Sequence, residues 1–212
     1  MISGSKMRPD QWLKRWLRAL VAVALLGTGT AWAFDLPELM SLLAQKKSGE
    51  ARFTEQRFVR GLDGPITAAG TLSFQAPDKL TRETTLPRPE SMAVDGNQLT
   101  LSRGGRTRTL TLDSMPEMQG MVEAMRGTLS GDAGTLQRYF KSKLGGSREG
   151  WTLDLAPTDE RLAAQVDGVR LTGRAGEVLG VEMTFRGGDR SVMTIVPGAA
   201  PTAKPAAARA PS

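Results

Sequence analysis

The stretch GTLSFQAPDKLTRETTLPRPESMAVDGNQLTLSR, residues 70–103, alternates apolar and polar side chains with a period of two. Thr, Ser and charged residues fall on one side of each segment, and the apolar pairs on the other side are Leu72/Phe74, Met92/Val94 and Leu99/Leu101. The turn residues DGN (95–97) separate two of the segments. This pattern predicts antiparallel strands that are apolar on one face only.

The same period continues on both sides of this stretch. Six strands are expected before residue 115, at 51–61, 66–77, 79–87, 90–96, 98–103 and 106–112. Four more are expected at 151–157, 161–173, 177–188 and 190–197, and helices at 35–49 and 131–144. A long one-faced sheet twists and curls. The sequence therefore predicts a mainly antiparallel α+β fold: an unclosed, strongly curved β-barrel of about 10–11 strands, with an N-terminal helix and mid-chain helices covering its apolar concave face.

Between the two groups of strands lies MPEMQGMVEAMRGTLSG, residues 115–131, with four methionines in one short segment. On a helix, the 3/4 spacing places five apolar side chains on one face, namely Met118, Met121, Val122, Met125 and Leu129. Met115 stands at the start of the segment. Methionine is flexible and polarizable, so such a stripe suits either an ordinary core or a surface for variable apolar ligands. Between two halves of a one-faced sheet, we interpret the helix as a movable cover.

The two ends of the chain differ from the middle. Residues 1–33 combine basic residues, the short apolar run ALVAVALLG (19–27) and AWA (31–33), as a cleavable signal peptide does; an uncleaved membrane anchor is the alternative. The tail, 197–212, is rich in Pro and Ala and is expected to be disordered. This leaves 34–196 as one folded domain. Export and the absence of Cys together indicate the periplasm of a Gram-negative bacterium.

Composition excludes several function classes. The leader has five basic residues and one acid and the tail two basic residues, so residues 34–196 are neutral although the whole chain carries +6. A neutral domain gives no reason to expect nucleic-acid binding. With neither His nor Cys, the commonest catalytic triads, thiol nucleophiles and histidine metal sites are excluded. We therefore expect no enzyme activity, no catalytic residue, no metal site and no cofactor.

Three motifs in order, FTEQ (53–56), GTLSFxxPxKL (70–80) and VDGxxL (94–99), resemble those of the LolA-type lipoprotein carriers. The matching positions are Phe53, Gln56, Gly70, Leu72, Phe74, Pro77, Leu80, Asp95, Gly96 and Leu99. The resemblance implies a periplasmic protein with an unclosed β-barrel and a helical lid over an apolar cavity. The residues expected to bind lipid are then Met115, Met118, Met121, Val122, Met125 and Leu129 of the lid, and Phe53, Leu72, Phe74, Leu80, Met92, Val94, Leu99 and Leu101 of the strands.

Two departures from that family pattern concern the lid and the cargo. LolA proper has an Arg directly before the motif Pro, where it holds the lid shut, whereas this chain has Ala76, and we consider Arg82 or Arg88 as a replacement latch. The segment KLTRETTLPRPESMAVDG (79–96) resembles LolA-like proteins encoded with fatty-acid-type and aryl polyene genes. This second resemblance implies a lipid or aryl polyene conjugate as cargo, and the resemblance to LolA proper implies a lipoprotein; the sequence leaves both open.

The resemblance also implies partners. We expect a monomeric carrier that shields acyl or other long apolar groups, receives them from an inner-membrane exporter and delivers them to an outer-membrane acceptor. The alternative is a lipid-sensing interaction domain of a periplasmic regulator with the same fold.

Overall fold

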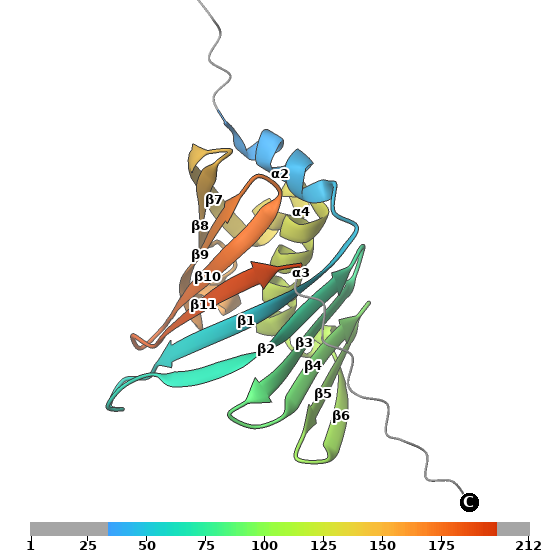
Figure 1. The fold of residues 1–212 in the computed structure, drawn as a ribbon, viewed down its shortest axis with the longest axis vertical. Helices are drawn as coiled ribbons and strands as arrows, with labels where there is room; N and C mark the ends of the chain where they lie inside the picture. The colour runs from blue at the N-terminus through green and yellow to red at the C-terminus, as the bar shows by residue number, and fades with distance from the viewer. Residues whose placement is uncertain (1–33, 199–212) are drawn as a thin grey trace, which may run out of the picture. The chain divides into compact units, whose positions relative to one another are not determined.

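One antiparallel sheet of eleven strands dominates residues 34–198, the part of the chain that the computed structural model describes. The strand order is β6-β5-β4-β3-β2-β1-β11-β10-β9-β8-β7, so the first and last strands of the chain, β1 and β11, pair in the middle (Figure 1). β6 and β7 form the two edges, and the curved sheet does not close. The predicted fold class is confirmed.

The strands before the helical insert are β1 (Ser48–Phe58), β2 (Ile66–Gln75), β3 (Lys79–Leu86), β4 (Glu90–Asp95), β5 (Gln98–Arg103) and β6 (Arg106–Thr111). Those after it are β7 (Phe140–Ser147), β8 (Gly150–Pro157), β9 (Val166–Arg174), β10 (Glu177–Phe185) and β11 (Arg190–Pro197). The helices are α2 (Leu36–Ala44), the 3-10 turn η1 (Leu112–Ser114), α3 (Pro116–Ser130), α4 (Ala133–Tyr139) and α5 (Glu160–Ala163). Among the described residues, none of the helices has the length and apolar character needed to cross a membrane.

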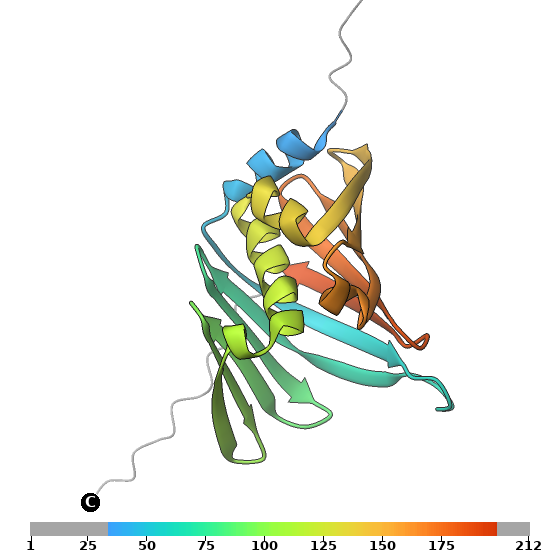
Figure 2. The same ribbon diagram turned by 180° about the vertical axis from the view of Figure 1, so that it is seen from behind.

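The strand register explains why one face of the sheet is apolar. Cross-strand partners lie on the same face of a sheet. Leu80 pairs with Phe74 on one side and with Val94 on the other, and Val94 pairs with Leu99. The predicted alternation therefore places these four side chains in one row across β2 to β5. The helices α3 and α4 lie on the concave side of the sheet, α3 runs across it, and α2 lies next to them at one end of the sheet (Figure 2).

The core consists of two separate clusters. The larger cluster joins α2, α3, α4 and α5 to β7–β9, with Leu39, Leu136, Phe140, Trp151 and Leu153 almost completely buried. The smaller cluster consists of Val94, Leu99, Leu112 and Val122, and joins β4 and β5 to η1 and α3. Helix α3 belongs to both clusters. It therefore connects the two halves of the sheet across the concave face.

Predicted and observed bounds differ most in three places. The helix expected over 35–49 ends at Ala44, and β1, expected over 51–61, spans residues 48–58. The helix expected over 131–144 ends at Tyr139, and residues 140–147 form the edge strand β7. Leu136, Phe140 and Leu144 fit a helical spacing, but Phe140 and Leu144 also fit a strand, and pairing with β8 selects the strand. The strand expected over 161–173 begins with α5, whose N-cap Asp159 accepts hydrogen bonds from the amides of Arg161 and Leu162. The segment predicted to be a signal peptide and most of the tail predicted to be disordered lie outside the described residues.

Candidate functional site

Helix α3 is bounded by clear local signals. Pro116 stands in its first turn, and Gly131 ends it in the left-handed conformation, with φ of 74°. A Cβ atom at residue 131 would lie 2.2 Å from the carbonyl oxygen of Met40 and 2.6 Å from the Cβ of Ala44, both in α2. The C-terminal end of α3 is therefore held against α2 by direct backbone contact, which only glycine allows here.

The predicted apolar stripe of α3 divides between the two core clusters. Met121 packs against the larger cluster, whereas Met115, Met118 and Val122 pack in or against the smaller one. Met125 occupies the middle of the stripe, yet 42% of its surface is exposed to solvent. The spacing predicts that these side chains share one face of the helix, as core or as ligand surface. In the structure this face is packed along both sides and accessible in the middle.

The predicted strand residues fall into three groups. Val94 and Leu99 are buried in the smaller cluster, and three more pack against it, namely Leu80, Met92 and Leu101. Leu72 and Phe74, on β2, are only half-buried and lie outside both clusters. Phe53 is buried in the middle of the sheet. The central strands thus carry apolar side chains that the closed structure leaves partly uncovered.

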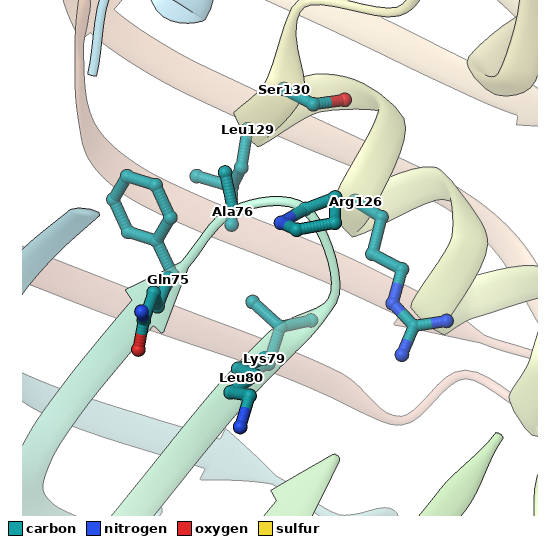
Figure 3. A pocket seen from close by; sticks show the side chains of 9 residues that line it. Gln75, Ala76, Lys79, Leu80, Arg126, Leu129 and Ser130 are labelled. Carbon is teal, nitrogen blue, oxygen red and sulfur yellow. The ribbon is translucent and has the colours of Figure 1, made fainter. Parts of the chain in front are cut away.

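A small cavity marks the junction between α3 and the β2–β3 turn. Its volume is about 10 Å³, room for a single water molecule. Leu129 projects from α3 toward Ala76, with Leu80 beneath, whereas Lys79 points away from the cavity (Figure 3). Pockets that hold whole ligands have volumes of roughly 300–1,000 Å³. This structure therefore describes the arrangement in which α3 is closed on the sheet.

Arg126 fastens α3 to the ends of two hairpins. Its Nη2 atom donates hydrogen bonds to the carbonyl oxygens of Asp78, at 2.8 Å, and Gly96, at 2.5 Å. Its Nη1 atom donates to Glu123 of the same helix at 2.8 Å. The side chain is 12% exposed, and Nε is buried without a partner. One cation on α3 thus holds the β2–β3 and β4–β5 turns together beneath the helix.

The two arginines predicted as latches do not fasten α3 in this structure. Arg82 lies within the sheet, where Nη2 donates to Glu55 at 2.5 Å and the guanidinium stacks over the ring of Phe53 at 4.5 Å from its centroid. Arg88 is exposed in the turn between β3 and β4. Arg126 occupies the role instead. Its partners outside α3 are backbone carbonyls, which have no sequence signature. The only sequence signal was a single Arg beside the apolar stripe of this helix.

Glu55 is the buried acid at the centre of the concave face. Burial opposes its ionisation, but hydrogen bonds from Ser191 and Arg82 and the charges of Arg82 and Arg57 outweigh that effect, so its pKa lies below the ordinary value of 4.5. Ser191 Oγ donates to the carboxylate at 2.5 Å. Because Ser191 lies on β11 and Arg82 on β3, this carboxylate connects the two halves of the sheet.

A second, larger groove of about 490 Å³ lies over β7–β10. The outward-facing side chains that line it carry alternating charges, and Arg170 pairs with Asp154 at 2.6 Å. Lys143 and Glu182 extend this row on the same face. This row of charges lies on the outer face, away from the apolar side chains beneath α3. The candidate site is therefore the concave face beneath α3.

The chain matches the model of a protein family described as outer membrane lipoprotein carrier protein LolA-like, over residues 28–211. No curated protein matches the sequence. Among solved structures, the chain is similar to a LolA superfamily protein of Nitrosomonas europaea, with 10% identity, coverage of 76% of this chain and 89% of that chain, and a TM-score of 0.43.

Two further structures are similar. A putative outer membrane lipoprotein-sorting protein domain of Vibrio parahaemolyticus has 10% identity, covers 76% of this chain and 88% of its own, and has a TM-score of 0.38. The MucA/MucB complex of Pseudomonas aeruginosa has 16% identity and a TM-score of 0.44, with 80% of this chain and 59% of that chain covered.

Proposed function

The chain belongs to the LolA-like family of outer membrane lipoprotein carriers, and from this membership we propose that it is a periplasmic carrier of acyl or other long apolar groups. It would take cargo from an exporter in the inner membrane, shield it beneath α3, and release it to an acceptor at the outer membrane. The cargo would be a lipoprotein, or a lipid or aryl polyene conjugate.

The observation that carries this proposal is the division of the core. A single core would place α3 permanently against the sheet, but α3 joins two clusters and leaves Met125, Leu72 and Phe74 partly exposed between them. Displacing α3 would uncover a continuous apolar surface. Methionine and leucine side chains can then contact each other in the closed state and cargo in the open state.

The energetics of transfer favour a lid of this kind. Burying one methylene group gains about 0.8 kcal/mol, so a chain of about 16 methylenes would gain roughly 13 kcal/mol in full. A carrier that bound with all of this free energy would not release its cargo. Part of it is used here to displace α3 from contacts that are themselves apolar. The closed state therefore competes with the cargo, and the net affinity falls into a range that allows transfer.

Binding of a fluorescent long-chain acyl probe to the exported protein tests the proposal. Met118, Met121 and Met125 changed together to Glu should abolish binding. That triple variant can also weaken folding, so Met125→Glu serves as a second variant at an already exposed position. It should weaken binding by roughly tenfold or more, because a charge would face the apolar chain of the probe. The control is Val196→Glu, at an apolar residue that is 52% exposed on the outer face. Unchanged binding in both methionine variants would contradict the proposal.

A further inference from the structure

Arginines gather on the inner face of the first half of the sheet. The register places Arg82 opposite Leu72, and Arg108 opposite Leu101, so both arginines share the face of the apolar residues. Arg103 and Arg106 are cross-strand neighbours on that face, next to the β5–β6 turn. We call the set Arg57, Arg82, Arg103, Arg106 and Arg108 the inner arginine band.

The positive charge of the band lies on the inner face of the sheet, whereas charged residues are ordinarily found on the face exposed to solvent. In β1–β6 the inner face carries the five arginines of the band and two acids, Glu55 and Glu90. The outer face of the same strands has two basic residues and three acids, namely Arg52, Lys79, Glu50, Glu83 and Asp95. A charge run is expected on the solvent side of a sheet. Here the excess of positive charge lies on the side that faces the lid.

Part of the band has no acidic partner. Glu55 pairs with Arg82 at 2.5 Å and Glu90 with Arg103 at 3.8 Å. Arg57 already acts on Glu55, whose pKa its charge lowers, but within residues 34–198 none of the ion pairs includes Arg106 or Arg108. Their side chains are exposed. They are therefore available to an anion from outside the chain.

The band begins where the apolar surface ends. Along β5, Leu99 and Leu101 come before Arg103, and the antiparallel neighbour β6 carries Arg106 and Arg108 before Leu110. One residue advances a strand by about 3.4 Å, so apolar and cationic side chains are about 7 Å apart. Arg126 and the closed end of α3 lie at the opposite ends of these strands. Along β5 and β6 the inner face is thus apolar beneath the lid and cationic beyond it, while Arg82 lies between Leu72 and Met92 within the apolar part.

From this arrangement we propose that the cargo is an anionic amphiphile, whose acyl or similar chain lies beneath α3 while its carboxylate or phosphate head group binds the inner arginine band. This inference rests on the proposed carrier function and specifies its substrate class. Guanidinium groups hold carboxylates and phosphates with two parallel hydrogen bonds. Stacking of Arg57 and Arg82 over Phe185 and Phe53 keeps two members of the band close to the apolar surface.

The test compares three fluorescent probes with one common acyl chain, ending in a carboxylate, a phosphate monoester or a neutral methyl ester. The full exported protein should bind at least one anionic probe about tenfold more tightly than the ester, a difference of about 1.4 kcal/mol. Whichever anion gains this advantage identifies the head group. Raising the salt concentration from 0.1 M to 1 M should reduce the advantage, because the Debye length falls from about 10 Å to 3 Å.

Two matched triple variants locate the effect. In Arg103→Gln/Arg106→Gln/Arg108→Gln, the anionic advantage should fall to about threefold or less. The control removes the same charge from exposed positions outside the band, as Arg52→Gln/Arg148→Gln/Arg174→Gln, and should keep the tenfold advantage. Equal binding of all three probes, or equal loss in both variants, would overturn the inference while the carrier function stands. Failure of every probe to bind would instead contradict the carrier function itself.

Discussion

Removing the guanidinium of Arg126 should loosen helix α3 without unfolding the sheet. The substitution Arg126→Met keeps an unbranched apolar stem in the space beside Leu129 and deletes the two hydrogen bonds to the carbonyls of Asp78 and Gly96. The substitution also removes the bond to Glu123, but that bond joins two residues of α3 and does not fasten the helix to the sheet. The perturbation therefore acts on the attachment between α3 and the two hairpin turns.

The size of the effect follows from the two lost bonds. A hydrogen bond contributes about 0.5–1.5 kcal/mol net, and because water can replace Arg126 at the two carbonyls once the helix is displaced, the two bonds together contribute about 2–3 kcal/mol, at the upper end of that range. Against this, the buried Nε atom has no partner and costs about 1 kcal/mol or more, which the variant recovers. We expect a net loss of about 1–2 kcal/mol. This increases the population of the open state of α3 roughly 5- to 30-fold.

Amide hydrogen exchange measures this opening directly. Amides of residues 121–130 should exchange roughly tenfold faster in Arg126→Met, while those of Leu153 and Leu171, in β8 and β9, change much less. Arg170→Met serves as the control, because it removes an exposed arginine whose 2.6 Å ion pair with Asp154 lies on the outer face. Unchanged exchange in α3, or an equal increase throughout the core, would refute the role of Arg126 as the fastening of the lid.

Two further predictions concern stability. Glu55→Gln should lower the free energy of unfolding at pH 7 by roughly 1–3 kcal/mol, because Arg82 loses its partner. The pKa of Glu55 is lowered in the folded state, so its contribution to the free energy of unfolding is present above about pH 4.5 and is lost as the pH falls further. Urea titrations at decreasing pH should therefore show a steeper loss of stability for the wild type than for the variant. Gly131→Ala should cost at least about 1 kcal/mol more than Gly61→Ala, because both positions have positive φ but only residue 131 contacts α2; equal urea midpoints would show that this contact contributes nothing.

Period-two patterning was enough to predict most of the sheet. The pairs Leu72/Phe74, Met92/Val94 and Leu99/Leu101 each mark an inner face, and the structure places them there because each strand must bury one side only. The sequence predicts a helix over 131–144, which includes the first half of β7, because Leu136, Phe140 and Leu144 satisfy both periods. The choice between them depends on β8, which lies later in the chain and whose pairing no local pattern reveals.

The candidate site was only partly visible in the sequence. The methionine spacing indicated an amphipathic helix across the sheet, and α3 is that helix. It could not indicate that the two sides of the stripe pack on different clusters, which leaves Met125 exposed. It also could not identify Arg126, whose acceptors are the carbonyls of Asp78 and Gly96. These are consequences of tertiary geometry, because turns from distant segments meet beneath one helix.

The central claim is that α3 must leave the concave face to admit cargo, and a reversible disulfide tests it most directly. The chain has no cysteine, so Ala76→Cys/Leu129→Cys introduces a single possible crosslink between α3 and the β2–β3 turn, at two residues that line the same small cavity. The control crosslink is Thr152→Cys/Thr172→Cys, between paired residues of β8 and β9. Oxidised Ala76→Cys/Leu129→Cys should fail to bind the acyl probe and regain binding on reduction, while the control binds in both states. Equal binding by the oxidised and reduced lid variant would contradict the account.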